Sequence, residues 1–158
     1  MLMRQGKSMS QQLNPAKMSG LEILQAMAEG IFPHPSICHT MPMQCVDISE
    51  GQVHFSVQAD DRHLNPMGGV HGGFAATVLD SVTGCATHTT LVAGESYGTV
   101  DLNVKMVRPI PKDTELHAKG KVLNVSKTVA ISEGEIRDKA GKLYAHCTAT
   151  CVITRPAK

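Results

Sequence analysis

The longest helical pattern in the chain follows His71, Gly72 and Gly73. Apolar residues there recur at intervals of three and four, at Phe74, Val78, Val82 and Cys85, with Ala75, Leu79 and Ala86 in adjoining rows. That spacing predicts a helix over roughly residues 72–91. Its other side carries small polar residues and glycine, and no Lys, Arg or Glu occurs between Gly72 and Gly94. A helix without long charged side chains is expected to be enclosed on most sides.

Other segments alternate with a period of two or read as short apolar runs, which is typical of strands. We expect strands over residues 36–48 (bent or at an edge because of Pro42), 53–57, 97–107, 114–125, 128–137 and 142–154. A short amphipathic helix precedes them, with Ser19 and Glu22 as a capping box and Gly30 at its end. Because the breaks between later strands are short, neighbours should be antiparallel. The expected fold is α+β, a curved antiparallel sheet of about five to six strands wrapped around one central helix.

The length and composition of the chain limit its domain organisation and its cellular compartment. The 158 residues suffice for one domain with a core, expected over residues 19–158, while the polar residues 1–18 are expected to form a mobile tail. The N-terminus has no apolar signal region, and no run approaches the length of a membrane span. Five cysteines, without a CxxC pair, fit neither a disulfide framework nor a zinc knuckle. We therefore expect a cytoplasmic protein that neither spans nor binds a membrane.

Charge and aromatic content argue against nucleic-acid binding. The 15 basic and 14 acidic residues leave a formal charge of +1, too little for a broad attractive field. Aromatic residues make up 3% of the chain and Trp is absent, so few side chains could stack on bases. Neither HExxH nor CxxC occurs among the His and Cys residues, so we expect no metal site.

Asp80 is the one formal charge within the predicted helix. It could lie on a narrow solvated strip or bond to nearby hydroxyls, which would be a structural use. The residues before it favour chemistry instead, because the segment 65–73 contains four glycines and lets backbone N–H groups converge at a helix start close to a ligand. An amide-rich helix N-terminus near a carboxylate indicates acyl chemistry. MGGVHGG lacks the spacing of a nucleotide-binding loop.

Two segments, NPMGGVHGGFAATVLDSV and YGTVDLNVKMVRPI, resemble the hotdog-fold acyl-CoA thioesterases of the PaaI-like type over roughly residues 53–154. The shared pattern is an Asn, a His-Gly-Gly that opens the central helix, an acid eight residues after the first of those glycines, and a hydroxyl near the next strand. These elements are Asn65, His71, Gly72, Asp80 and Thr99. The resemblance implies a thioesterase acting on aryl or medium- to long-chain acyl-CoA, without metal or other cofactor, assembled as a dimer of dimers.

The implied roles make chemical sense. The Gly72 N–H would polarise the thioester carbonyl, and such donors contribute roughly 3 to 4 kcal/mol. Asp80 would act as a general base on water or attack the carbonyl directly, and these alternatives stay open. Thr99 would hold the water, Asn65 the acyl or water oxygen, and His71 would orient the loop or the acyl group. Substrate contacts are expected from Gly73, Lys105 and Arg108. The side chains of Lys105 and Arg108, together with the nearby Lys112, could meet the CoA phosphates.

Two other functions remain open from the sequence. A hotdog-type hydratase or dehydratase would use a His and an acid to move a proton at carbon, and a noncatalytic acyl-CoA binding module would keep the pocket without needing Asp80. Helix geometry adds an expectation about assembly. Gly72 and Asp80 lie about 12 Å apart along one helix, too far to meet one carbonyl. We therefore expect active sites shared between two antiparallel copies of the helix, with Ala76 and Gly84 small enough for close approach.

Overall fold

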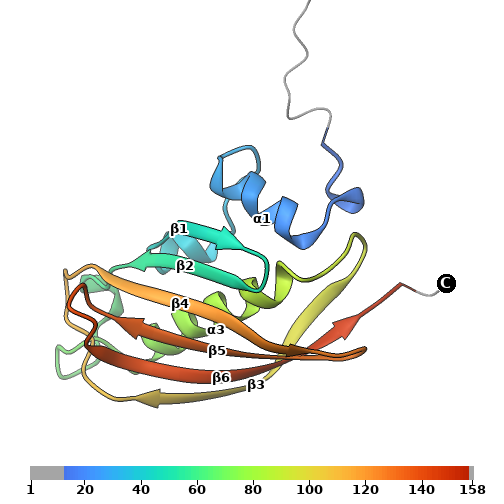
Figure 1. The fold of residues 1–158 in the computed structure, drawn as a ribbon. Helices are drawn as coiled ribbons and strands as arrows, with labels where there is room; N and C mark the ends of the chain where they lie inside the picture. The colour runs from blue at the N-terminus through green and yellow to red at the C-terminus, as the bar shows by residue number, and fades with distance from the viewer. Residues whose placement is uncertain (1–12, 157–158) are drawn as a thin grey trace, which may run out of the picture.

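The computed structural model describes residues 13–156 and contains a six-stranded sheet that curves around one long helix (Figure 1). In chain order the elements are α1 (Gly20–Ala28), α2 (Ile37–Thr40), β1 (Met43–Ser49), β2 (Gln52–Val57), α3 (Gly72–His88), β3 (Ser96–Met106), β4 (Leu116–Val125), β5 (Val129–Arg137) and β6 (Leu143–Thr154). Single 3-10 turns occupy Pro15–Lys17 and Asp61–His63. Of the tail expected over residues 1–18, residues 1–12 lie outside the described part.

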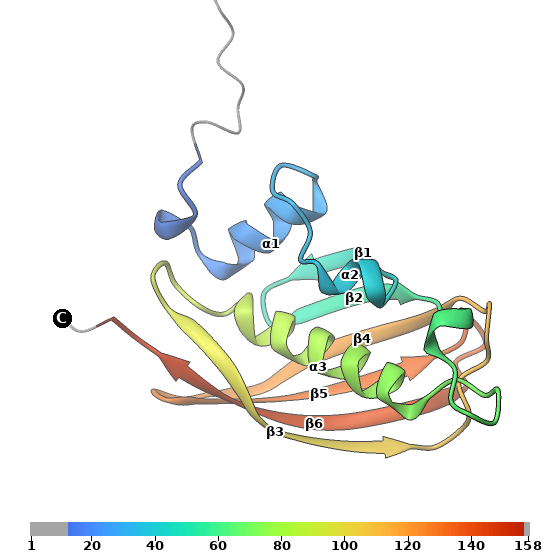
Figure 2. The same ribbon diagram turned by 180° about the vertical axis from the view of Figure 1, so that it is seen from behind.

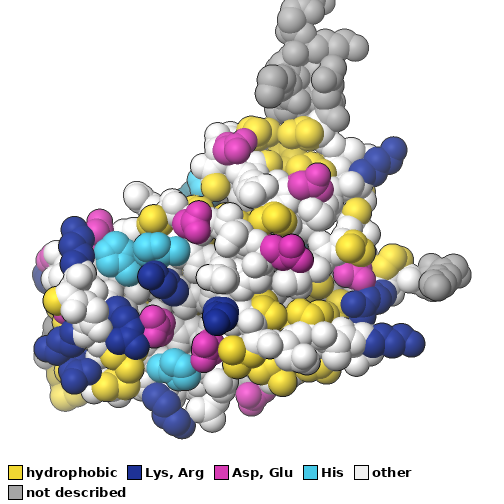
Figure 3. Space-filling view, viewed as in Figure 1, with side chains coloured by type: hydrophobic (Ala, Val, Ile, Leu, Met, Phe, Trp, Pro, Cys, Tyr) yellow, Lys and Arg dark blue, Asp and Glu magenta, His cyan; other side chains and the backbone are white. Residues whose placement is uncertain are grey.

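All neighbouring strands are antiparallel, in the order β1-β2-β4-β5-β6-β3. α3 lies along the concave face (Figure 2), while the outer face carries basic, acidic and His side chains (Figure 3). Within residues 13–156, β1 and β3 form the two edges of the sheet, so β3 is paired there on one side, with β6. The expected α+β architecture is confirmed. No helix within residues 13–156 has the length and apolar character needed to cross a bilayer.

α3 is packed directly against the backbone of the sheet. A Cβ on Gly120 of β4 would lie 2.1 Å from the Val82 carbonyl oxygen, so only glycine allows this approach. The helix's small polar residues are satisfied inside: the Thr83 hydroxyl donates to the Leu79 carbonyl (2.8 Å), and Thr87 bonds Ser132 of β5 (3.0 Å). The predicted enclosure of this helix is confirmed. It ends at His88 rather than Leu91, because Thr90 and Leu91 close a turn onto Thr87 and His88.

β3 runs antiparallel to α3, which fixes what lies beside each end of the helix. Tyr97, near the start of the strand, contacts Gly84, while Met106, at its end, contacts Gly72. A β-bulge interrupts the pairing with β6 between Thr99 and Asp101. Because of the extra residue there, Thr99 and Leu102 both oppose buried residues of β6. The bulge therefore keeps Tyr97 and Thr99 on the helix side of the sheet.

The segment expected as one strand over residues 36–48 is instead a helical turn followed by a strand, so that prediction is wrong for residues 37–40. The turn α2 is closed locally: the Cys38 N–H donates to the Pro35 carbonyl (3.0 Å), and the Thr40 hydroxyl donates to the Ile37 carbonyl (3.1 Å). Met41 then becomes extended because a proline follows it. β1 begins after Pro42. The capping box of α1, between Ser19 and Glu22, is confirmed.

Candidate active site

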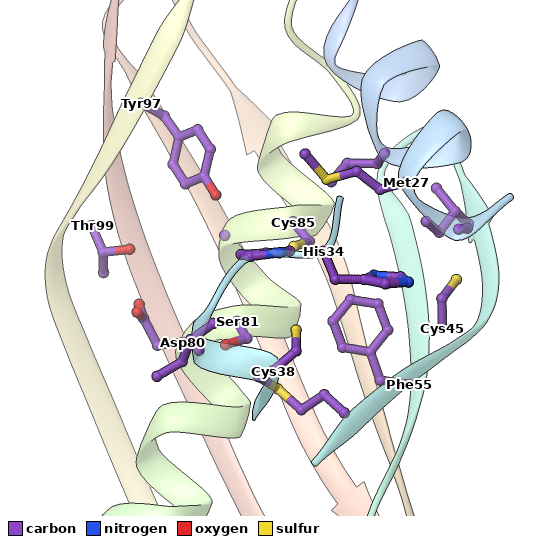
Figure 4. Close-up of a pocket in the computed structure, with 17 residues that line it drawn as sticks. Met27, His34, Cys38, Cys45, Phe55, Asp80, Ser81, Cys85, Tyr97 and Thr99 are labelled. Atoms are coloured by element: carbon purple, nitrogen blue, oxygen red, sulfur yellow. The ribbon is translucent and has the colours of Figure 1, made fainter. Parts of the chain in front are cut away.

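A pocket of about 270 Å³ opens where α3 faces β3 on one side and β1, β2 and the N-terminal helices on the other (Figure 4). Its walls are mostly apolar and come from distant parts of the chain. The apolar lining includes Leu24 and Met27 of α1, Ile37 of α2, Met43 of β1 and Phe55 of β2. Such a cavity, lined mostly by hydrophobic side chains from several elements, suits an apolar ligand.

Asp80 and Thr99 both line this pocket from the α3 and β3 side. Asp80 is the only exposed residue of α3. In the single chain it therefore lies on a solvated strip at the pocket, rather than enclosed like the rest of the helix. Thr99 is exposed as well, with its hydroxyl 3.7 Å from the Cys151 sulfur. The structure thus brings the predicted acid and the predicted hydroxyl to one cavity.

The start of α3 carries the second group of predicted residues. The His71 imidazole caps the helix, its Nδ1 accepting the Gly73 N–H at 2.8 Å. Accepting at Nδ1 leaves the proton of a neutral imidazole on Nε2. Among residues 13–156, none accepts a hydrogen bond from the Gly72 N–H. The Gly72 amide is therefore an available donor at the positive end of the helix dipole.

The loop before α3 is held by its own side chains. Asn65 Oδ1 accepts the N–H groups of Met67 (2.9 Å) and Gly69 (3.2 Å), so its carbonyl supports the turn while its NH₂ group faces no acceptor within the described chain. His63 is 7% exposed, accepts the Asp60 N–H at Nδ1 (2.9 Å) and packs edge-on against Phe74. This anchoring fixes the loop relative to the helix start.

The predicted residues therefore form two groups rather than one site. Asp80 and Thr99 line the pocket, whereas Asn65, His71, Gly72 and Gly73 are absent from its lining. Two helical turns separate Gly72 from Asp80, about 12 Å along α3. Met106 lies over Gly72, since a Cβ there would be 2.7 Å from the Met106 sulfur. Within one chain, these residues cannot meet a single carbonyl.

The predicted cations lie away from the pocket. Lys105 opposes His146 and so faces the outer side of the sheet, opposite to Met106. Arg108 donates through Nη1 to the Leu143 carbonyl at 2.6 Å, while Lys112 pairs with Asp61 at 2.6 Å. Contact of these cations with CoA phosphates stays a prediction.

Several residues at the pocket are not among the predicted site residues. Tyr97 lies beside Thr99, and its signal in the sequence is only an alternation of two along β3. Cys38, Cys45 and Cys85 also line the pocket, and burial raises the pKa of each thiol, for Cys85 to about 12. These thiols are therefore protonated at neutral pH and are poor nucleophiles. The apolar face of α1 is visible in the sequence, but what it covers is not.

Comparison with known proteins identifies the group to which this geometry belongs. The pattern of the thioesterase superfamily matches residues 67–145, which include the start of α3, Asp80 and Thr99. The chain belongs to the thioesterase superfamily. Human acyl-coenzyme A thioesterase 13 is 30% identical over 101 residues, which is 63% of this chain and 71% of that protein.

Two solved structures extend the comparison. The phenylacetic acid degradation-related protein of Ralstonia eutropha JMP134 is 31% identical, covers 81% of this chain and 97% of its own, and superposes with a TM-score of 0.74. A Streptococcus mutans UA159 protein at 21% identity shares the fold, with a TM-score of 0.67 over 73% of this chain and 91% of its own. The resemblance to PaaI-like thioesterases and the hotdog fold are confirmed. Thioester hydrolysis is the activity that this membership supports.

Proposed function

We propose that the protein hydrolyses acyl-CoA thioesters to a free acid and CoA. The observation that carries this proposal is an apolar pocket with one carboxylate, Asp80, at the point where it meets solvent. An apolar pocket holds the acyl group, while a solvated carboxylate can take a proton from water. The reaction needs no metal or cofactor besides the CoA of the substrate itself.

The size of the pocket supports a substrate whose acyl group is buried while its CoA part stays outside. At about 270 Å³ it lies just below the roughly 300 to 1,000 Å³ typical of ligand pockets. That volume suits an aryl or medium-length acyl group, with the CoA moiety outside. The S. mutans structure was obtained with acetyl CoA bound, and the human relative is named for acyl-coenzyme A, which supports CoA as the carrier.

In the proposed reaction Asp80 removes a proton from a water held by Thr99, and the water oxygen attacks the thioester carbonyl carbon. The negative charge that develops on the carbonyl oxygen is stabilised by the Gly72 N–H and the Asn65 NH₂ group. The C–S bond then breaks, and the proton passes from Asp80 to the departing sulfur. Direct attack by Asp80, giving an anhydride that water opens, is the alternative.

The pair Asp80 and Thr99 can meet the pair Asn65 and Gly72 in a dimer in which the edge strand β3 pairs with its two-fold copy. Because β3 runs antiparallel to α3, its two ends lie beside Gly84 and Gly72 respectively. Antiparallel pairing of two β3 edges brings the Gly72 end of one chain beside the Asp80 end of the other. The exposed Val100 and Met106 side chains on β3, 64% and 57% accessible, support burial against a partner. Each site would then take Asn65 and Gly72 from one chain and Asp80 and Thr99 from the other.

The cap at α3 weighs against a hydratase or dehydratase. Those reactions need an imidazole nitrogen free to accept a proton, but His71 Nδ1 already accepts the Gly73 N–H, which assigns the hydrogen of the neutral ring to Nε2. His71 can therefore donate to a substrate oxygen without acting as the base. The five free cysteines support a reducing, cytoplasmic setting for the enzyme.

Thiol release tests the proposal. The purified protein is mixed with a panel of aryl, medium- and long-chain acyl-CoA esters, and free CoA is followed with DTNB. We expect turnover that depends on the acyl group and is abolished by filling the pocket with Ser81→Trp. Tight binding of acyl-CoA without thiol release would identify a noncatalytic binding module, and addition of water across an unsaturated acyl group would identify a hydratase.

A further inference from the structure

Tyr97 lies across α3 at the one glycine in the middle of that helix. A Cβ on Gly84 would be 3.0 Å from the Tyr97 hydroxyl oxygen and 3.1 Å from its ring. Glycine in a helix interior costs roughly 1 kcal/mol relative to alanine. The helix thus forgoes stability at this position, and the space gained is filled by the phenol. The His88 ring, one helical turn after Gly84, also packs against Tyr97, with ring centroids 5.5 Å apart, so two positions of α3 hold the phenol in place.

Tyr97 lines the pocket (Figure 4), and no residue within 13–156 hydrogen-bonds its hydroxyl. Because no buried side-chain nitrogen or oxygen in that range lacks a partner, the hydroxyl oxygen reaches the solvent of the pocket. Burial, with smaller effects of Cys85, Cys151 and Asp80, raises the pKa of Tyr97, so it stays an O–H donor at neutral pH. Tyr144, the other tyrosine of the chain, donates to Asp138 at 3.3 Å. Phenol hydroxyls in apolar surroundings usually find a partner. For Tyr97 that partner is water in the free pocket, and a ligand that displaces this water can take its place.

The Tyr97 hydroxyl lies further along the pocket than Asp80 and Thr99, where the thioester would react. Tyr97 and Thr99 are two residues apart on the same side of β3, roughly 7 Å along the strand. Gly84 and Asp80 are likewise one turn apart on α3, roughly 6 Å along its axis. An acyl group whose carbonyl lies at Asp80 and Thr99 therefore passes the phenol about four or five bonds further along its chain.

We propose that Tyr97 is a substrate-binding residue whose hydroxyl donates a hydrogen bond to an oxygen substituent part-way along the acyl group. The preferred substrates are then acyl thioesters that carry a hydroxyl or keto oxygen near the fifth carbon, rather than plain hydrocarbon chains. Gly84 supplies the space that positions this donor. The inference rests on the proposed function, because it takes Asp80 and Thr99 as the reacting end.

The test compares octanoyl-CoA with 3-, 5- and 7-hydroxyoctanoyl-CoA. One hydrogen bond contributes a net roughly 0.5 to 1.5 kcal/mol. If it forms with the bound acyl group, kcat/KM for the 5-hydroxy compound should exceed that for octanoyl-CoA by up to about tenfold. Tyr97→Phe should bring this ratio close to one, and Gly84→Ala, which displaces the phenol, should lower it as well. Tyr144→Phe removes the other phenol hydroxyl and should leave the ratio unchanged.

The ratio separates this inference from the proposed function. Hydrolysis of octanoyl-CoA with no preference for any hydroxy compound, or a preference that survives Tyr97→Phe, overturns the role of Tyr97 and leaves the thioesterase function standing. If no thioester is hydrolysed, the proposed function fails, and calorimetric affinities of the same four compounds decide the inference. Equal affinities, or a difference unaffected by Tyr97→Phe, would then refute it.

Discussion

Asp80 combines two features that rarely occur in one residue: it is the one formal charge of an otherwise neutral helix and the one exposed position on it. Because the side chain is exposed, its replacement should not disturb folding. We expect Asp80→Asn to lower kcat on acyl-CoA by about 10² or more, since proton transfer from water is lost. The melting temperature should stay that of the wild type. Asp47→Asn, an exposed carboxylate on β1, is the control, and near-normal turnover of Asp80→Asn would remove this residue from the mechanism.

Gly72 is harder to test alone, because Met106 lies where its side chain would be. Gly72→Ala should lower kcat/KM by roughly tenfold or more if a methyl group keeps the carbonyl from the N–H. The double variant Gly72→Ala with Met106→Ala removes the intramolecular clash. Activity that stays low in the double variant supports the role of the amide in catalysis. Recovery on truncating Met106 would show that Gly72 only makes room for methionine.

At the scale of residues, the sequence predicts the two polar groups but not their surroundings. Asp80 is conspicuous because the residues around it are uncharged, and Gly72 because it belongs to a glycine-rich segment. Tyr97 and the three pocket cysteines are not conspicuous, because their proximity depends on strands and helices far apart in the chain. The bulge at Thr99 is likewise invisible in the alternation, yet it decides which β3 side chains face α3.

At the scale of elements, the close packing of α3 against β4 stabilises the fold. Gly120→Ala would place a methyl carbon 2.1 Å from the Val82 carbonyl, so the helix must move off the sheet. We expect the free energy of unfolding to fall by about 1 to 3 kcal/mol or more, seen as a lower urea midpoint. Gly98→Ala on β3 is the matched control, because nothing lies within 4 Å of its Cβ, and its midpoint should barely change. A wild-type midpoint for Gly120→Ala would contradict the close packing.

Helix periodicity and strand alternation predicted every long element, whereas the segment before Pro42 was missed. Its four helical residues are too few for a period to appear, and the turn is closed by bonds to Pro35 and Ile37 that propensity does not encode. The end of α3 was overestimated for a similar reason. Leu91 is apolar and buried, but it reaches the core from a turn.

At the scale of the whole molecule, shared sites predict complementation between inactive variants. Asp80→Asn and Gly72→Val are unfolded together and refolded. In a heterodimer one site carries both substitutions and the other carries none. Random pairing should therefore restore roughly a quarter of the wild-type sites. If each site lay within one chain, no intact site could form, so a mixture that contains heterodimers and is no more active than its parents would exclude shared sites.

The edge position of β3 has a further consequence for the single chain. An eleven-residue strand with one side unpaired in the part of the chain that the structure describes offers its backbone N–H and C=O groups to any other extended segment. A newly folded copy at low concentration thus carries a template for non-native aggregation as well as for pairing. Asp101 and Lys105 place opposite charges along this strand, which disfavours stacking in register with identical copies, where like charges would be adjacent. The same two residues are compatible with antiparallel pairing, in which each can approach the opposite charge.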